Sequence, residues 1–278
     1  MKIGLVTDNT CNLTAEEIKE YDVRIVSLYI NRNGNYTKAT ELNLDEYYEE
    51  LAAAAELPRT SQPSPQDFIA VFKEALEIYD ALIVPVLSGK LSGTSVSANI
   101  AAKAFEKPIH VIDSQLIADG TGMLVKNLGD MINSGANLDE LVEYGTNFHE
   151  KTRTFCSTDD LSYLVKGGRI GKAKALMGNL LKMKPVIVVD EGELKPVENV
   201  RGNKKLLDVL VSHVFSEIPP ERLRRARVLT IWRKEDGKTL ERMLREKAPE
   251  AEVESRVIEA IIGTHLGPQG IGVISEMK

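Results

Sequence analysis

The chain has 278 residues, of which 43% are hydrophobic and 27% are charged, a balance that predicts one large or two modest folded domains and excludes global disorder. Lys and Arg number 35 against 41 Asp and Glu, a net charge of −6, which excludes a general nucleic-acid binder because phosphate recognition needs a basic face. The longest apolar run, residues 81–87, is far shorter than the roughly 20 residues that cross a bilayer. Because Cys11 and Cys156 form no disulfide or metal motif and no signal-peptide pattern opens the chain, we expect a cytoplasmic protein.

The first half of the chain alternates short apolar runs with helical patterns. Runs rich in Val, Ile and Leu predict strands at residues 3–6, 23–30, 81–87 and 109–112. Nearly continuous apolar strands suit a parallel sheet that is covered on both faces, and the helical patterns between them predict βαβ units. We therefore expect an α/β fold with a doubly wound parallel sheet in an N-terminal domain, residues 1–152.

The second half has a different pattern. Two apolar runs flank residues 190–193, a sequence typical of a hairpin turn. Further strands are predicted at residues 227–231, 253–257 and 272–275, with helices between them. We expect a C-terminal α/β domain with a mixed sheet, residues 153–278.

Hydroxyl side chains precede a predicted helix near residue 65. Ser64, Pro65 and Asp67 have the spacing of an N-cap, a first-turn proline and a capping box, so a structural role is expected for Ser64. Thr60 precedes this cap, and the nearby prolines favour extended backbone. Thr60 is therefore expected on a stiff loop with its hydroxyl available.

A second hydroxyl-rich segment, residues 88–97, follows the strand predicted at 81–87 and opens a helix of small residues. Ser92 is expected at the helix start, on the carboxyl edge of a parallel strand, where open α/β sheets bind ligands and free N–H groups attract anions. Ser92 could instead cap its own helix, and the two roles are compatible.

No standard catalytic motif is present. Residues 89–93 read GxxSG rather than the GxSxG of a nucleophile elbow. The glycine-rich segments at 120–122 and 167–173 are incomplete dinucleotide and phosphate loops. His265 lies between glycines, and we expect it on a turn, where spacing alone allows a structural role or a contact with a ligand.

Charge is unevenly distributed. Residues 1–50 hold five Lys or Arg and ten Asp or Glu, whereas residues 201–247 hold 13 and seven. Residues 161–189 contain no acidic residue but six Lys or Arg, including Arg169. This basic stretch is typical of a solvated helical face, or of a docking surface for an acidic partner or an anionic ligand end.

Six segments together resemble the DegV family of bacterial fatty-acid-binding proteins. They occur in family order and span almost the whole chain. The segments are TDNTCNL (7–13), TSQPS (60–64), LSGT (91–94), VIDS (111–114), KGGRIGK (166–172) and GTHLGP (263–268).

The resemblance implies the EDD fold, shared with the dihydroxyacetone kinase substrate subunit, and a long-chain fatty acid in an apolar tunnel with its carboxylate near the domain junction. It implies ligand binding by Thr60, Ser61, Ser92, Gly93, Thr94 and His265. Some members hand the fatty acid to a separate fatty acid kinase, which phosphorylates the carboxylate with ATP. Arg169 and Arg201 match basic positions on the partner-facing side.

These implications describe a lipid carrier without catalytic residues, metal or cofactor, and with fatty acid, kinase and a transient membrane surface as partners. Because only 5% of residues are aromatic, a tunnel would be lined mainly by aliphatic side chains and adaptable methionines. The tunnel candidates are Met177, Leu180, Leu181 and Met183, for which ordinary core packing is the alternative.

Two other classes of protein stay open. A hydrolase would use Ser92 with His265, and a dihydroxyacetone-kinase-like substrate subunit would use His265 covalently; both need a third group to orient the pair. A lipid-responsive regulatory module would use the basic stretch to bind a partner without transferring the ligand.

Overall fold

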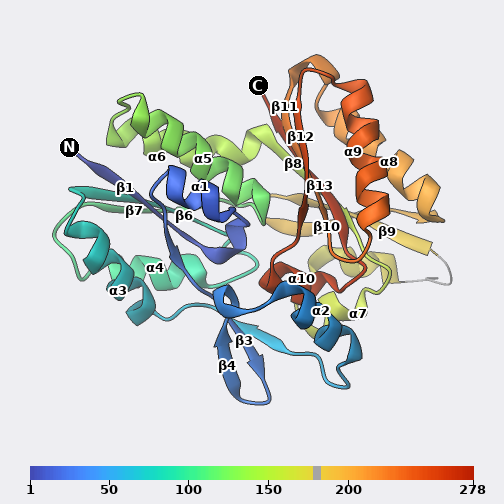
Figure 1. Cartoon of the computed structure of the whole chain (residues 1–278), viewed down its shortest axis with the longest axis horizontal. Coiled ribbons are helices and arrows are strands. Elements are labelled where there is room, and N and C mark those ends of the chain that lie inside the picture. The colour runs from blue at the N-terminus through green and yellow to red at the C-terminus, as the bar shows by residue number, and fades with distance from the viewer. Residues whose placement is uncertain (178–182) are drawn as a thin grey trace. The chain divides into compact units, whose positions relative to one another are not determined.

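The computed structural model describes residues 1–177 and 183–278, and the packing of the chain divides it into two compact units. Unit 1 comprises Met1–Leu42 and Thr60–His149, and unit 2 comprises Asn43–Arg59 and Glu150–Lys278. Figure 1 shows the elements of both units, which form a parallel sheet in unit 1 and a mixed sheet in unit 2. The predicted α/β fold class is confirmed.

The sheet of unit 1 consists of four parallel strands. Every residue of its two central strands is buried, as expected for a parallel sheet covered on both faces. In sheet order the strands are β2 (Arg24–Val26), β1 (Ile3–Asp8), β6 (Ala81–Val86) and β7 (Ile109–Asp113).

Helices cover both faces of this sheet (Figure 1). Phe68 and Phe72 on α3 and Ala98 on α4 share one core with Val84 of the sheet, while α5 and α6 lie over the opposite face. Ser64 caps α3 and exchanges hydrogen bonds with Asp67 as predicted. The helices are α1 (Ala15–Glu20), α3 (Pro65–Leu76), α4 (Thr94–Ala102), α5 (Asp119–Asn133) and α6 (Leu138–Asn147).

The strand predicted at residues 23–30 is wrong in its length, because the chain leaves the main sheet after Val26. The backbone N–H of Leu28 donates to Asn9 Oδ1 over 2.7 Å, so it pairs with a side chain instead of a strand. A three-stranded sheet follows, with Asn33 and Gly34 at positive φ in its hairpin turn. Its order is β4 (Asn35–Lys38), β3 (Tyr29–Arg32) and β5 (Arg59–Ser61).

The sheet of unit 2 is mixed, as predicted: β11 and β12 are parallel and the other pairs are antiparallel. The predicted hairpin turn is confirmed at Glu191 and Gly192, which both have positive φ, the geometry that suits two-residue hairpin loops. In sheet order the strands are β10 (Glu193–Arg201), β9 (Met183–Asp190), β8 (Thr152–Ser157), β13 (Ile271–Met277), β11 (Leu223–Thr230) and β12 (Glu252–Val257).

Two long helices bury one face of this sheet. Leu210 of α8 and Leu240 of α9 are fully buried in one core with Val228 and Val273 of the strands. The helices of unit 2 are α2 (Leu44–Ala53), α7 (Ser162–Lys166), α8 (Asn203–Glu217), α9 (Lys234–Lys247) and α10 (Ala260–Leu266).

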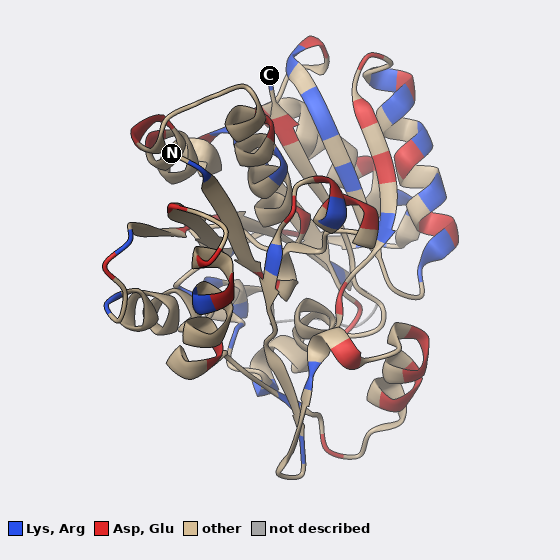
Figure 2. Ribbon diagram, turned by 60° about the vertical axis from the view of Figure 1, so that its left-hand side comes forward, with Lys and Arg blue, Asp and Glu red and all other residues tan. Residues whose placement is uncertain are grey.

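Residues 43–59 pack with unit 2, although the sequence placed them within a first domain of residues 1–152. The helix α2 is amphipathic: its acidic residues, which colour much of its ribbon red in Figure 2, are exposed, whereas Tyr47 and Tyr48 are buried. Both tyrosines bond to α10 or the residues just before it. A buried aromatic pair thus joins a segment to a partner more than 200 positions away, which local sequence patterns do not reveal.

Short 3₁₀ helices complete the fold. None of the helices in the described ranges is long and apolar enough to cross a membrane. The 3₁₀ helices are η1 (Asn9–Cys11), η2 (Ala39–Glu41), η3 (Phe148–Lys151), η4 (Gly171–Met177) and η5 (Pro220–Arg222).

Candidate functional site

Ser92 lies in the loop between β6 and α4, at the carboxyl edge of the parallel sheet. Of the two roles considered for Ser92, the capping role is not seen, since the N-cap is Gly93 and α4 begins at Thr94. The Ser92 Oγ contacts Thr94 Oγ1 at 2.9 Å. This hydroxyl pair lies at the start of α4, whose N-cap residue makes no side-chain hydrogen bond to the helix N–H groups. Thr94 is fully buried and Ser92 is half-buried.

Thr60 and Ser61 are half-buried residues of β5, so the loop expected at Thr60 is wrong. The next residue connects them to the Ser92 loop. Gln62 Nε2 donates to the Gly93 carbonyl over 3.2 Å and to Ser97 Oγ over 2.9 Å. A Cβ on Gly93 would lie 2.2 Å from Gln62 Oε1, so glycine is required for this approach. The structure therefore brings the two predicted hydroxyl segments together within unit 1.

The Ser92 loop is also bonded to two aspartates, each of which is the last residue of a neighbouring strand. Asp8 accepts the N–H of Leu87, and Asp113 accepts the N–H of Gly89. Burial raises the pKa of Asp8 above its usual value, although its hydrogen bonds oppose the shift. Sequence reasoning gave neither aspartate a role; their positions at the ends of predicted strands were the available signal.

His265 belongs to unit 2 and lies in the last turn of α10, so its expected location on a turn is wrong. Gly167 allows its approach to α7, because a Cβ on this glycine would lie 2.2 Å from His265 Nδ1. Burial and, secondly, the positive charge of Arg169 lower the pKa of His265 to about 4. The imidazole is therefore neutral near pH 7 and can donate one hydrogen bond and accept another.

Three hydroxyl groups hold the helix that carries His265. Tyr47 Oη bonds to Thr264 Oγ1, and Tyr48 Oη donates to the Ile258 carbonyl over 2.6 Å. Thr158 Oγ1 donates over 2.7 Å to the carbonyl of Leu266 at the end of α10. These contacts were missed by sequence reasoning, because each joins residues far apart in the chain.

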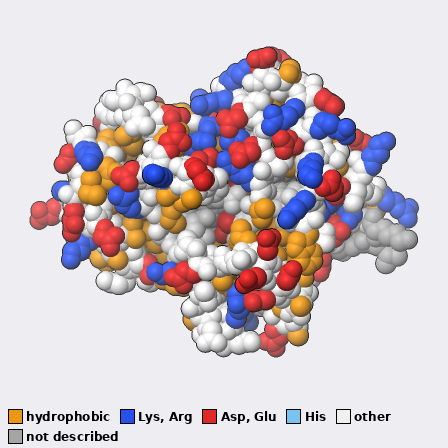
Figure 3. Space-filling model, in the orientation of Figure 1, with side chains coloured by type: hydrophobic (Ala, Val, Ile, Leu, Met, Phe, Trp, Pro, Cys, Tyr) orange, Lys and Arg blue, Asp and Glu red, His pale blue; other side chains and the backbone are white. Residues whose placement is uncertain are grey.

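The two predicted docking arginines differ in exposure. Arg169 is half-buried and donates from Nη1 to the Gly167 carbonyl over 2.7 Å, whereas Arg201 is exposed at the end of β10. The excess of Lys and Arg in residues 201–247 is largely a solvated surface: Figure 3 shows basic and acidic side chains intermixed over α9, where Lys238 pairs with Glu235.

The candidate tunnel residues are partly beyond the described ranges. Met177 is 40% exposed and Met183 is half-buried, while Leu180 and Leu181 lie outside the described residues. The incomplete dinucleotide pattern is helix packing, since Gly122 lies inside α5 and a Cβ there would meet the Cys11 carbonyl at 2.4 Å. Within residues 1–177 and 183–278, no group of three or more His, Cys, Asp or Glu side chains could hold a metal ion.

A parallel-sheet unit with hydroxyls at its carboxyl edge, joined in sequence to a mixed-sheet unit, defines a class of two-unit α/β protein. In such sheets the carboxyl edge is the usual place for a ligand. A family model described as an uncharacterised protein of the DegV family matches residues 2–278. A DegV domain-containing protein of Caldanaerobacter subterraneus subsp. tengcongensis is 32% identical over 100% of this chain and 99% of its own length. The chain belongs to the DegV family.

Solved structures share the whole fold. The DegV family protein of Thermus thermophilus, described by its fatty acid binding, has a TM-score of 0.92 and 32% identity, covering 100% of both chains. DegV of Bacillus subtilis, described as a fatty acid binding protein, has a TM-score of 0.91 and 29% identity over 100% of both chains. The Streptococcus pneumoniae fatty acid kinase B3 protein loaded with linoleic acid, with 23% identity over 100% of both chains, has the same fold at a TM-score of 0.87.

Proposed function

We propose that this protein binds a long-chain fatty acid in an apolar tunnel and presents its carboxylate to a partner fatty acid kinase for phosphorylation. The observation that supports the binding role most strongly is the full-length likeness to the Thermus thermophilus protein, together with the hydroxyl segments that meet through Gln62 and Gly93. In this proposal the chain is a carrier, and the partner supplies the catalysis.

The acyl chain and the head group of the ligand make different contributions to the proposed binding free energy. An acyl chain of about 15 methylenes gains on the order of 12 kcal/mol on leaving water, at ~0.8 kcal/mol for each CH₂, which exceeds the several kcal/mol of lost freedom on binding. The head group then needs only to be satisfied and oriented. Neutral hydroxyls do this at about 1.5–3 kcal/mol for each charge-assisted hydrogen bond.

The proposed head-group ligands are the hydroxyls of Thr60, Ser61 and Ser92 with the backbone at Gly93. Thr94 is fully buried, and it acts in this proposal by orienting the Ser92 hydroxyl that it contacts. His265 adds a neutral imidazole. Without a Lys or Arg clamped on the carboxylate, release to a phosphorylating partner costs less.

The hydrolase alternative receives no support from the contacts of Ser92. A serine nucleophile is activated by an adjacent base, whereas the Ser92 Oγ contacts another neutral hydroxyl, that of Thr94. Each hydroxyl has one O–H, and the contact between them uses only one of the two. The other O–H suits an acceptor such as a carboxylate.

The first experiment identifies the ligand. Protein purified without added lipid is extracted with organic solvent, and mass spectrometry of the extract is expected to show long-chain fatty acid in near-stoichiometric amount. Protein that carries no lipid and also fails to bind added oleate or palmitate would refute the proposal.

The second experiment tests the head-group residues. The double substitution Thr60→Ala and Ser92→Ala is expected to weaken fatty acid binding by at least tenfold, since each lost charge-assisted bond is worth about 1.5–3 kcal/mol. Ser64→Ala is the matched control: it removes a hydroxyl from the same segment, but one that caps α3, and it should lower stability by about 1 kcal/mol without changing affinity. Equal affinities in all three proteins would exclude the assignment.

The third experiment tests the partner. With a fatty acid kinase and ATP, Arg169→Ala combined with Arg201→Ala is expected to slow phosphorylation of the bound ligand while fatty acid affinity is unchanged. Arg242→Ala removes an exposed charge from α9 and should leave the rate unchanged. A rate that is insensitive to both arginines would remove them from the docking surface.

A further inference from the structure

The loop that carries Ser92 is bonded on both sides to carboxylates of the flanking strands. In the sheet, β6 lies between β1 and β7. Asp8 is the last residue of β1, and Asp113 is the last residue of β7. Both side chains accept backbone N–H groups from the residues that follow β6.

Asp8 uses both carboxylate oxygens. Its Oδ2 accepts the Leu87 N–H over 2.8 Å, and its Oδ1 accepts the N–H and the hydroxyl of Thr10. Asp8 is completely buried. It therefore joins the ends of β1 and β6 from inside the unit, where an unmade hydrogen bond would be costly.

Asp113 acts from the exposed side of the same loop. Its Oδ1 accepts two N–H groups, that of Gly89 over 2.9 Å and that of Gln115 over 3.0 Å. A Cβ on Gly89 would lie 2.4 Å from Asp113 Oδ2, so the close approach of the carboxylate requires glycine at this position. One oxygen of Asp113 thus joins the end of β7 to the loop after β6.

The hydrogen bonds from Leu87 to Asp8 and from Gly89 to Asp113 lie on either side of Ser88, whose carbonyl accepts the N–H of Ser92. Ser88 stands between Leu87 and Gly89, and its carbonyl accepts the N–H of Leu91 and the N–H of Ser92, each over 3.1 Å. The backbone N–H of Ser88 donates to the Leu116 carbonyl over 2.9 Å. The position of Ser92 therefore follows from the position of Ser88, which the aspartates fix on either side.

We propose that Asp8 and Asp113 are positioning residues that fix the β6–α4 loop so that the Ser92 hydroxyl is held ready for a carboxylate. This inference rests on the proposed function, since it assumes that Ser92 contacts the ligand. A loop containing Gly89 and Gly93 loses much backbone freedom when it is ordered. Ordering it before the ligand arrives removes that cost from binding.

The principal test compares Asp113→Ala with Asp113→Asn and Asp80→Ala. Asp113→Ala is expected to weaken binding of a long-chain fatty acid about tenfold, in proportion to one lost charge-assisted contact at Ser92. It should leave binding of the fatty alcohol of equal length within about twofold, because the alcohol lacks the carboxylate that the loop is positioned to hold. Asp113→Asn should retain fatty acid affinity, since the amide oxygen can accept both N–H groups that Oδ1 accepts.

Asp80→Ala is the matched control. Asp80 is also exposed and also accepts a backbone N–H, that of Lys2 over 2.7 Å, but it precedes β6 instead of following it. This variant loses the same kind of bond at the opposite edge of the sheet, and its affinity for fatty acid should be unchanged. Equal weakening by Asp80→Ala and Asp113→Ala would reduce the effect to general stability and overturn the inference.

The same measurements on Ser92→Ala separate the inference from the function. If Ser92→Ala binds fatty acid as tightly as the unchanged protein, Ser92 is not a ligand, and the proposed head-group site fails. If Ser92→Ala weakens binding but Asp113→Ala does not, only the positioning role fails. Positioning through Ser92 also predicts that Asp113→Ala has little further effect in the Ser92→Ala protein, because the two changes remove one interaction.

Asp8 gives an independent contrast. Asp8→Asn replaces one accepting oxygen by an NH₂ group, which cannot accept the N–H of Leu87 or of Thr10. Asp113→Asn is therefore expected to be tolerated. Asp8→Asn is expected to weaken fatty acid binding and to increase amide exchange across residues 87–92. Equal tolerance at both positions would contradict the bonding pattern on which the inference depends.

Discussion

The two units place their polar groups in opposite ways. In unit 1 the central strands are apolar and buried, and the hydroxyls and aspartates of the candidate site lie at strand ends or in loops. In unit 2 charged side chains lie within the sheet itself: Arg225 and Glu276 are neighbours on paired strands, and both are buried.

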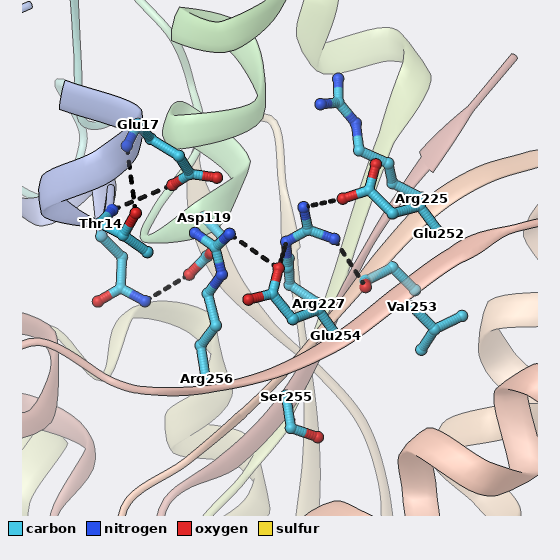
Figure 4. A network of polar contacts seen from close by, with 12 residues as sticks. Thr14, Glu17, Asp119, Arg225, Arg227, Glu252, Val253, Glu254, Ser255 and Arg256 are labelled. Carbon is cyan, nitrogen blue, oxygen red and sulfur yellow. Dashed lines mark hydrogen bonds and ion pairs between the residues drawn. The ribbon is translucent and has the colours of Figure 1, made fainter. Parts of the chain in front are cut away.

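Figure 4 shows how the charged face of unit 2 continues onto its edge strand. Arg227 reaches both Glu252 and Glu254 of β12, and Glu254 also pairs with Arg256. Alternate residues of a strand share one face, which gathers these acidic and basic side chains into one network. The aspartates of unit 1 thus accept N–H groups of a loop backbone, whereas the carboxylates of unit 2 pair with arginines within the sheet.

The largest expected effect tests this dependence at Glu276, which is 1% exposed. Arg225→Ala should destabilise the protein by about 3–5 kcal/mol, because it removes a buried partner from a buried carboxylate. Arg224→Ala is the matched control: Arg224 bonds to the other oxygen of Glu276 but is 44% exposed, and its loss should cost at most about 1 kcal/mol. Denaturant unfolding measures both, and similar losses would show that burial of the pair is unimportant.

The next effect is the pH dependence that His265 gives to unit 2. Its pKa falls from 6.5 to about 4 on folding, so below pH 6.5 the unfolded chain binds a proton that the native protein does not. Stability from this residue is complete above pH 6.5 and is lost as the pH falls toward 4, by roughly 2–3 kcal/mol at about 1.4 kcal/mol per pH unit.

His265→Gln isolates this contribution, because glutamine does not titrate. The stability of the unchanged protein should fall more steeply than that of the variant between pH 6.5 and 4, while the two curves run parallel above pH 7. NMR titration of the imidazole gives the pKa directly. A value near 6.5 would contradict the burial of this side chain.

The contrast between the units also explains what the sequence could reveal. The apolar runs of β1 and β6 predicted the parallel sheet because strands that are buried along their whole length have an apolar local composition. The cap at Ser64 and the turn at Glu191 and Gly192 were also predictable from local sequence. Each depends on residues within a few positions of one another.

Long-range hydrogen bonds leave no such local pattern. Asp8 and Leu87 are 79 positions apart, and Tyr47 and Thr264 are 217 apart. The family resemblance selected Ser92 and His265, but the residues that hold them were found only in the folded chain. Capping was the alternative role for Ser92, because serine is a common N-cap, but its hydroxyl contacts Thr94.

A smaller effect on stability is expected from a substitution at Gly167, which contacts His265 in unit 2. Gly167→Ala would place a Cβ 2.2 Å from His265 Nδ1, so the imidazole must move outward at a cost of about 1–3 kcal/mol. Its pKa should then rise from about 4 toward its ordinary value, since burial causes most of the shift. Gly168→Ala is the control: its φ of +71° makes alanine strained, but the added Cβ meets nothing within 4 Å. It should lose stability and leave the imidazole pKa unchanged.

The smallest effect concerns the tyrosine that joins residues 43–59 to α10. Tyr47→Phe removes the hydroxyl that bonds to Thr264, while Thr264 keeps its bond to the Ala260 carbonyl over 2.6 Å. The ring still fills its buried position, so the expected loss is about 1 kcal/mol, the net value of one hydrogen bond. Tyr36→Phe, at a side chain that is 59% exposed, should change stability by less than about 0.5 kcal/mol. If Tyr47→Phe is equally neutral, the Tyr47–Thr264 hydrogen bond contributes nothing measurable to the attachment of this segment. A measurable loss would instead show that α10 is held by directed hydrogen bonds, as the Ser92 loop is in unit 1.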